Sequence, residues 1–125
     1  MTIALWCVFV AGLLPYIATG LAKGGPEKFD NNEPRAWIAR QTGAKARANA
    51  AQMNSFEVFP FFAAAVIIAR VLHGPQQIVN ILALIFIAAR VVYLLCYIRG
   101  LATARSLVWG VGMASVIGIF IVASL

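Results

Sequence analysis

Polar and charged side chains recur at helical spacing in two of the most hydrophobic stretches of the sequence. The first stretch opens with AQMNSFEVFPFF, residues 51–62, and continues as an apolar run to residue 69. Arg47, Asn54, Glu57 and Phe61 are spaced by seven, three and four residues, so they share one helix face. The second stretch carries Arg90, Tyr93 and Tyr97, spaced by three and four. Such side chains can bind an anionic ligand through directed hydrogen bonds.

The two polar faces are predicted to meet at one depth in a helical hairpin. With a rise of about 1.5 Å per residue, Glu57 lies roughly 15 Å along its helix from Arg47. Arg90 lies roughly 13 Å from Arg99, which starts at the same side. A lone charge inside a bilayer costs at least about 2.5–3.5 kcal/mol, so Glu57 and Arg90 are expected to pair, within one chain or across a subunit contact. Two interpretations stay open, a pair that only fixes the bundle and a polar face that lines a water-accessible ligand pocket.

Four segments are long enough to carry these faces across a bilayer, which takes about 20 residues. Of the 125 residues, 62% are hydrophobic and only 11% are charged, which excludes an ordinary soluble domain. We therefore predict one all-α integral membrane domain over residues 1–125, a bundle of four transmembrane helices at 3–22, 45–72, 77–99 and 104–125. Small residues on the last segment are expected to permit close helix packing: Gly110, Gly112, Ala114, Ser115 and Gly118.

Basic residues gather on one side of the predicted bundle. The first loop and its flank carry Lys23, Lys28, Arg35, Arg40, Lys45 and Arg47, and the third connection adds Arg99 and Arg105. The opposite side has only Arg70, so the positive-inside rule predicts that the first and third loops are cytoplasmic. The net charge of +6 then indicates contact with anionic membrane lipids. Nucleic acid is not an expected partner, because the chain has no basic run with interleaved aromatic residues.

The long first loop, residues 23–43, is expected to contain a short helix at the membrane interface. Asn32 is the expected N-cap, and Pro34 would lie in the first turn. Trp37 and Ile38 would share one face, with Trp37 at headgroup level. No metal site is predicted, because two cysteines in separate apolar stretches and a single histidine give no ligand spacing.

The two polar motifs resemble those of the MAPEG family, the membrane-associated proteins in eicosanoid and glutathione metabolism. The family motif on the second helix runs roughly R-x-x-R-A-x-x-N-x-x-E-x-x-P, and Arg47, Asn54, Glu57 and Pro60 match it here. The third-helix motif, A-R-x-x-Y with a second tyrosine four residues on, is matched by residues 89–97. The loop segment DNNEPRAW resembles the D-N-x-x-P-R stretch of bacterial members. The resemblance extends over nearly the whole chain.

The resemblance implies a left-handed four-helix bundle that assembles as a homotrimer, here in a bacterial inner membrane. It implies a glutathione transferase or peroxidase that acts on hydrophobic electrophiles or lipid hydroperoxides. Glutathione, the co-substrate, would lie between neighbouring subunits near the cytoplasmic side. The residues that the motifs assign to glutathione binding are Arg47, Gln52, Asn54, Glu57, Arg90, Tyr93 and Tyr97.

Arg105, at the start of the last helix, is the position that the resemblance assigns to catalysis. In the family, an arginine there stabilises the glutathione thiolate. A nearby cation in a low-dielectric site lowers the pKa of a thiol from about 8.5, which makes the sulfur a better nucleophile at neutral pH. The other interpretation of Arg105 is an arginine at the rim of the bundle.

Ala50 departs from the family motif, because the family has its second arginine there. This departure motivates an alternative function, a non-catalytic membrane protein of the same fold that binds a lipid or a partner. A small proton-coupled exporter that uses Glu57 is a third hypothesis. Such exporters usually carry the key carboxylate on the first helix, and this chain has none there.

Overall fold

The computed structural model describes all residues, 1–125, and contains five helices. They are α1 (Ile3–Lys23), α2 (Pro34–Ala39), α3 (Gly43–Val71), α4 (Gln76–Ile98) and α5 (Ala102–Ala123). The four long helices begin and end within one turn of the predicted segments. All four are long and apolar enough to cross a membrane. The chain therefore folds as an all-helical bundle with the length and composition of a multi-pass membrane protein.

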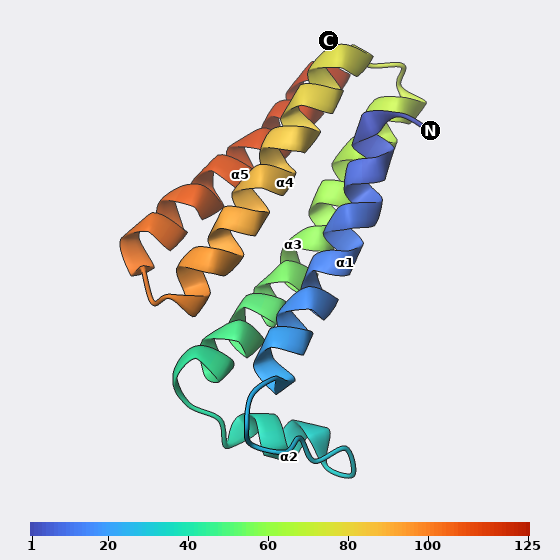
Figure 1. Cartoon of the computed structure of the whole chain (residues 1–125). Coiled ribbons are helices and arrows are strands. Elements are labelled where there is room, and N and C mark those ends of the chain that lie inside the picture. The colour runs from blue at the N-terminus through green and yellow to red at the C-terminus, as the bar shows by residue number, and fades with distance from the viewer.

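The long helices lie side by side, and α2 lies across one end of the bundle (Figure 1). Both chain termini and the α3–α4 turn lie at the other end. The most extensive contacts join α4 to α5 and α1 to α3, and the α3–α4 contact is smaller. The bundle is thus two helix pairs packed together. We call the end that holds α2 and the α4–α5 connection the basic end, because the basic residues counted above gather there.

Tight turns close the ends of α3 and α4. After α3, His73 adopts a left-handed conformation with φ 56°, and the Gly74 N–H donates to the Ala69 carbonyl at 2.9 Å. After α4, Gly100 has φ 74° and the Leu101 N–H donates to the Cys96 carbonyl at 2.9 Å. Both are Schellman caps, which satisfy carbonyls that the helix end would leave without partners. The second cap starts α5 immediately and sets its antiparallel path along α4.

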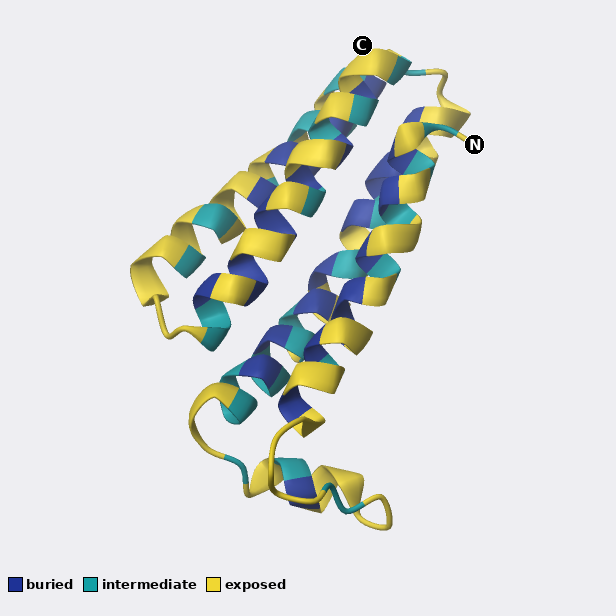
Figure 2. Cartoon of the chain, in the orientation of Figure 1, coloured by how far each residue is buried: buried dark blue, intermediate teal, exposed yellow.

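A layer of aromatic and small side chains forms the core between the helices. Phe62 of α3 stacks on Phe86 of α4 with ring centroids 3.9 Å apart. Ala65, Val116 and Ile119 are fully buried around these rings. Buried residues face inward on every long helix, while the outer faces are exposed and largely apolar (Figure 2). This inside-and-outside pattern suits a bundle whose outer surface contacts lipid.

The short helix in the first loop differs from the prediction at its N-cap. Its N-cap is Glu33 rather than Asn32, because Pro34 is the first helical residue and a following proline keeps Glu33 out of the helical conformation. Asn32 instead donates its backbone N–H to Asp30 Oδ1 at 2.9 Å. Trp37 is buried within the chain and packs edge-on against Phe29 with centroids 5.1 Å apart, and its placement at headgroup level stays a prediction.

The small residues of α5 divide between two faces. Gly112 and Gly118 lie against α4, where a Cβ on Gly112 would be 3.7 Å from Phe86 and one on Gly118 would be 3.3 Å from Leu82. Ser115, which lies between these two glycines in the sequence, is also buried. Gly110 and Ala114 are exposed, so they do not contribute to close packing within the chain. The prediction of close packing therefore holds for part of the set.

Gly118→Val is expected to destabilise the bundle by roughly 1–3 kcal/mol, because the added methyl groups overpack against Leu82. The matched control is Gly110→Val, where an added Cβ meets no atom within 4 Å. Thermal unfolding of the detergent-solubilised proteins measures the difference. Equal unfolding midpoints for the two variants would contradict the close α4–α5 packing.

Candidate functional site

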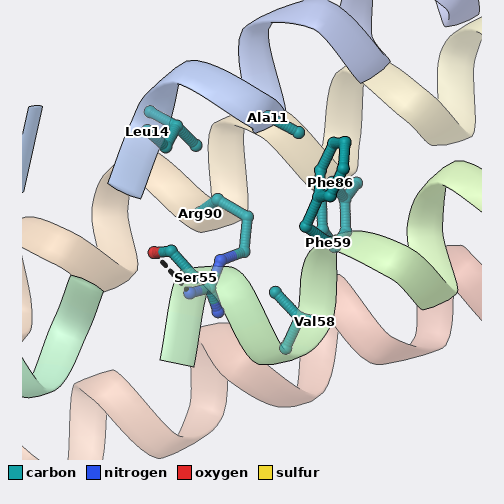
Figure 3. Close-up of a pocket in the computed structure, with 7 residues that line it drawn as sticks. All are labelled: Ala11, Leu14, Ser55, Val58, Phe59, Phe86 and Arg90. Carbon is teal, nitrogen blue, oxygen red and sulfur yellow. Dashed lines mark hydrogen bonds between the residues drawn. The ribbon is translucent and has the colours of Figure 1, made fainter. Parts of the chain in front are cut away.

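Arg90 is turned into the interior of the bundle and is only 4% exposed. Its side chain lies among α1, α3 and α4, next to Leu14, Val58 and Phe86 (Figure 3). Arg90 Nη2 donates a hydrogen bond to Ser55 Oγ at 3.2 Å. The Ser55 hydroxyl donates in turn to the Ala51 carbonyl at 2.8 Å, so its oxygen is free to accept from the guanidinium. The surrounding space has no volume left for a water molecule.

The expected ion pair between Glu57 and Arg90 does not form within the chain. Glu57 is exposed, and its Oε2 accepts a hydrogen bond from Asn54 Nδ2 at 3.3 Å. Successive residues on a helix are rotated by about 100°, so Ser55 projects from a different side of α3 than Glu57. Ser55 is the residue that faces α4, and it takes the place expected for the carboxylate. Pairing across a subunit contact stays a prediction.

Arg90 begins a series of contacts between cations and aromatic rings that reaches α5. Its guanidinium carbon lies 4.1 Å from the centroid of the Tyr93 ring. Tyr93 meets Tyr97 edge-on with centroids 5.6 Å apart, and the guanidinium of Arg105 lies 4.5 Å from the Tyr97 centroid. Cation–π contacts contribute about 0.5–2 kcal/mol each, more where water is excluded. The series therefore fixes both tyrosines and Arg105 relative to the buried Arg90.

A cleft of about 240 Å³ lies where α3, α4 and α5 meet. Its lining residues are Asn54, Tyr93, Tyr97, Arg105, Ser106 and Trp109. Asn54, Tyr93, Tyr97 and Arg105 were predicted as site residues from the sequence. They come from three different helices, and the structure brings them to one cavity. Ser106 and Trp109 were missed. The signal for Trp109 was its spacing of four residues after Arg105, which places both on one face of α5.

Asn54 leaves one polar atom in the protein interior without a partner. Its Oδ1 is buried and accepts no hydrogen bond, while its Nδ2 donates to Glu57. A buried acceptor without a donor costs about 1–3 kcal/mol, and such atoms in proteins generally serve a ligand, a water molecule or a neighbouring chain. Asn54 lines the cleft, but its Oδ1 has almost no accessible surface, so a ligand N–H or O–H group would reach it only after a rotation of the side chain.

Arg47 and Gln52, also predicted as site residues, lie outside this cleft. Arg47 Nε donates to the Ile98 carbonyl at 3.0 Å, so it caps the end of α4 beside Gly100. Gln52 lines a separate cavity of about 580 Å³ between α1, α2 and α3. Two residues along a helix correspond to a rotation of about 200°, so Gln52 and Asn54 point to opposite sides of α3. The two side chains of one chain cannot contact the same ligand.

Ala50 lies one turn before Asn54 and therefore on the same side of α3. It is only partly buried, and a methyl group offers no hydrogen bond. Among the cleft residues, Arg105 is the only cation.

The family comparison agrees with this architecture. The MAPEG family model matches residues 3–125, so the chain belongs to the MAPEG family. No curated protein and no solved structure matched the chain. Together with the four apolar helices, the match makes this chain a MAPEG-like multi-pass integral membrane protein.

Ser55→Ala is expected to lower the free energy of unfolding by about 1–3 kcal/mol, because it removes the hydrogen-bond acceptor of the buried Arg90 guanidinium. Glu57→Gln, the matched change at the exposed neighbour, should stay within about 0.5 kcal/mol of wild type. Thermal and urea unfolding in detergent measure both changes. The reverse order, with Glu57→Gln the more damaging, would contradict Ser55 as the main partner of Arg90 and would favour an ion pair across subunits.

Proposed function

We propose that this chain is a glutathione-dependent enzyme, a transferase or peroxidase acting on hydrophobic electrophiles or lipid hydroperoxides. The observation that carries the proposal is the cleft that unites Asn54, Tyr93, Tyr97 and Arg105. It combines a guanidinium, two phenol groups and an unpaired buried amide oxygen in one cavity next to the apolar surface of α5. MAPEG membership supports the same class of activity.

The donors and acceptors of the cleft suit a zwitterionic peptide with a thiol. Glutathione has two carboxylates, one ammonium group, two amide N–H groups and one thiol. The Glu57 carboxylate, which accepts from Asn54 Nδ2, can also accept a hydrogen bond from the ammonium or an amide, and the Asn54 amide oxygen can do so once its side chain turns toward the cleft. Tyr93 and Tyr97 present hydroxyl groups that hold the peptide in one orientation.

Arg105 is the group proposed to stabilise the thiolate. Its guanidinium is held over the Tyr97 ring at the edge of the cleft, so its position is set before the substrate binds. The thiol gives its proton to water, and the positive charge of Arg105 stabilises the resulting anion. In the transferase reaction the sulfur then forms a bond to an electrophilic carbon as the leaving group departs with its electron pair. In the peroxidase reaction the sulfur attacks the peroxide oxygen, the alkoxide departs and is protonated, and a second glutathione thiol reduces the sulfenic acid to the disulfide and water.

The proposal includes a homotrimer with a left-handed bundle in each subunit and with the basic end in the cytoplasm. Gln52 supports a site between subunits, because it faces away from the cleft of its own chain and would reach glutathione only from a neighbour. A hydrophobic second substrate would enter from the bilayer. Trp109 is the exposed aromatic side chain of the cleft that such a substrate would meet.

A second candidate function is a non-catalytic member of the family that binds a lipid or a partner. The observation that favours it is Ala50, since a methyl group replaces a guanidinium on the Asn54 side of α3. The binding cleft then has one cation fewer for an anionic peptide.

Arg105→Leu is expected to reduce turnover by about 10²-fold or more, because the developing thiolate loses its stabilising charge. The assay is conjugation of glutathione to a hydrophobic electrophile, and reduction of a lipid hydroperoxide, by the purified protein in detergent. Arg99→Leu removes an exposed arginine at the same end of the bundle and is the matched control.

The control should retain wild-type turnover, and neither variant should change the unfolding midpoint by more than a few degrees. Wild-type protein that shows no turnover and no glutathione-dependent rise in the unfolding midpoint would favour the non-catalytic function.

A further inference from the structure

Glutathione has two carboxylates, and the cleft alone offers no cation for either of them. Arg105 is the only cation in the cleft lining, and it is the group proposed to stabilise the thiolate. Two arginines expected to bind the peptide have partners inside the chain, since Arg47 Nε donates to a backbone carbonyl at the end of α4 and Arg90 Nη2 donates to Ser55. Ala50 stands where the family motif has a further arginine. A cation for a carboxylate therefore has to come from outside the cleft.

The cavity around Gln52 contains such a cation on α2. Arg35, Ile38 and Asn49 also line this cavity of about 580 Å³, and no acidic residue does. Arg35 and Ile38 are three residues apart, so one face of α2 is turned toward the cavity. Because Gln52 would reach glutathione only from a neighbouring subunit, Arg35 would reach the peptide from that same subunit. The cavity is then the second half of one site between subunits.

An aromatic cluster fixes α2 and leaves Arg35 available. Trp37, the one buried residue of α2, packs edge-on against Phe29, and Lys45 Nζ at the start of α3 lies 5.0 Å from the centroid of its ring. Lys23, the other cation of the cavity lining, is held over Phe29 with its Nζ 4.4 Å from the ring centroid. Arg35 is exposed. It is therefore the free cation of the lining, on a helix whose position Trp37 sets.

We propose that Arg35 binds one of the two carboxylates of glutathione and supplies the positive charge that Ala50 removes from the family motif. Its planar guanidinium can form two parallel hydrogen bonds to one carboxylate. The inference rests on the proposed function, since it names a further ligand of the same site. It makes α2 of one subunit, which carries neither of the two polar motifs, a determinant of which peptide the neighbouring cleft accepts.

Calorimetric titration of glutathione into the purified full-length protein in detergent tests the assignment. Arg35→Gln should bind glutathione at least about tenfold more weakly than wild type, because a charge-assisted pair of hydrogen bonds is lost. The matched control is Arg40→Gln, which removes an exposed arginine at the other end of α2, outside the cavity, and should keep wild-type affinity.

Two peptide analogues identify the carboxylate that Arg35 binds. One is glutathione with its glycyl carboxylate esterified, and the other is glutathione without the α-carboxylate of its glutamyl residue. For the analogue that lacks the carboxylate in question, wild type and Arg35→Gln should bind equally. For the other analogue, the loss of affinity in Arg35→Gln should persist.

Equal affinities of wild type and Arg35→Gln for glutathione would overturn this inference and leave the proposed function standing. Equal losses in Arg35→Gln and Arg40→Gln, or the same loss for glutathione and both analogues, would also overturn it, because Arg35 would then act only through the general positive charge of the basic end. Wild-type protein that binds no glutathione would overturn both the inference and the proposed function. If Arg35→Gln unfolds, Arg35→Lys keeps the charge without the planar pair of donors and must still bind glutathione more weakly than wild type.

Discussion

A buried guanidinium is the constraint around which the site is organised. Arg90 lies inside a membrane bundle, where a charge without partners would cost several kcal/mol of free energy. Ser55 accepts its hydrogen bond and Tyr93 offers the face of its ring, so α3 and α4 must keep the register that holds these groups together. The gap that Arg90 lines between α1, α3 and α4 has no room for a water molecule, so a shift of either helix could not be filled by solvent there. The position of Tyr93, and through it of Tyr97, follows from this register.

The close packing of α5 on α4 also fixes the side chains at the edge of the bundle. The left-handed Gly100 turn starts α5 directly after α4, and Gly112 and Gly118 let the two helices approach closely. Arg105 is thereby brought over the Tyr97 ring, at the mouth of the cleft that Asn54 lines from α3. The cleft has a fixed cation on α5 and the amide side chain of Asn54 on α3. This polarity supports the proposal of a zwitterionic thiol as the ligand.

The sequence alone was sufficient to predict the four long helices and most of the residues that line the cleft. Hydropathy and length locate the four long helices, and the spacing of Arg90, Tyr93 and Tyr97 identifies the polar face of α4. Spacing states which residues share a face but not which face turns inward. That is why the depth match between Glu57 and Arg90 predicted an ion pair where the structure has Ser55 facing the guanidinium.

Other differences come from contacts between segments that no local pattern contains. Arg47 shares a face with Asn54, yet its long side chain reaches the end of α4 and binds the Ile98 carbonyl. Phe29 packs against Trp37 within the first loop, a contact that the helical spacing of Trp37 does not show. The prediction that Gln52 binds the ligand rests on a motif match alone. A motif does not state whether its residues act within one chain or between chains. The large cavity around Gln52 required the placement of α2 against α1 and α3.

The central proposal is that the cleft binds glutathione through the Asn54 side chain. The most direct measurement is calorimetric titration of glutathione into the purified wild-type protein and into Asn54→Leu. We predict saturable binding to the wild type and affinity at least about tenfold lower in the variant, with an unfolding midpoint that is unchanged or higher because a buried unpaired amide is removed. Wild-type protein that gives no binding heat, or equal affinities for the two proteins, would contradict the account.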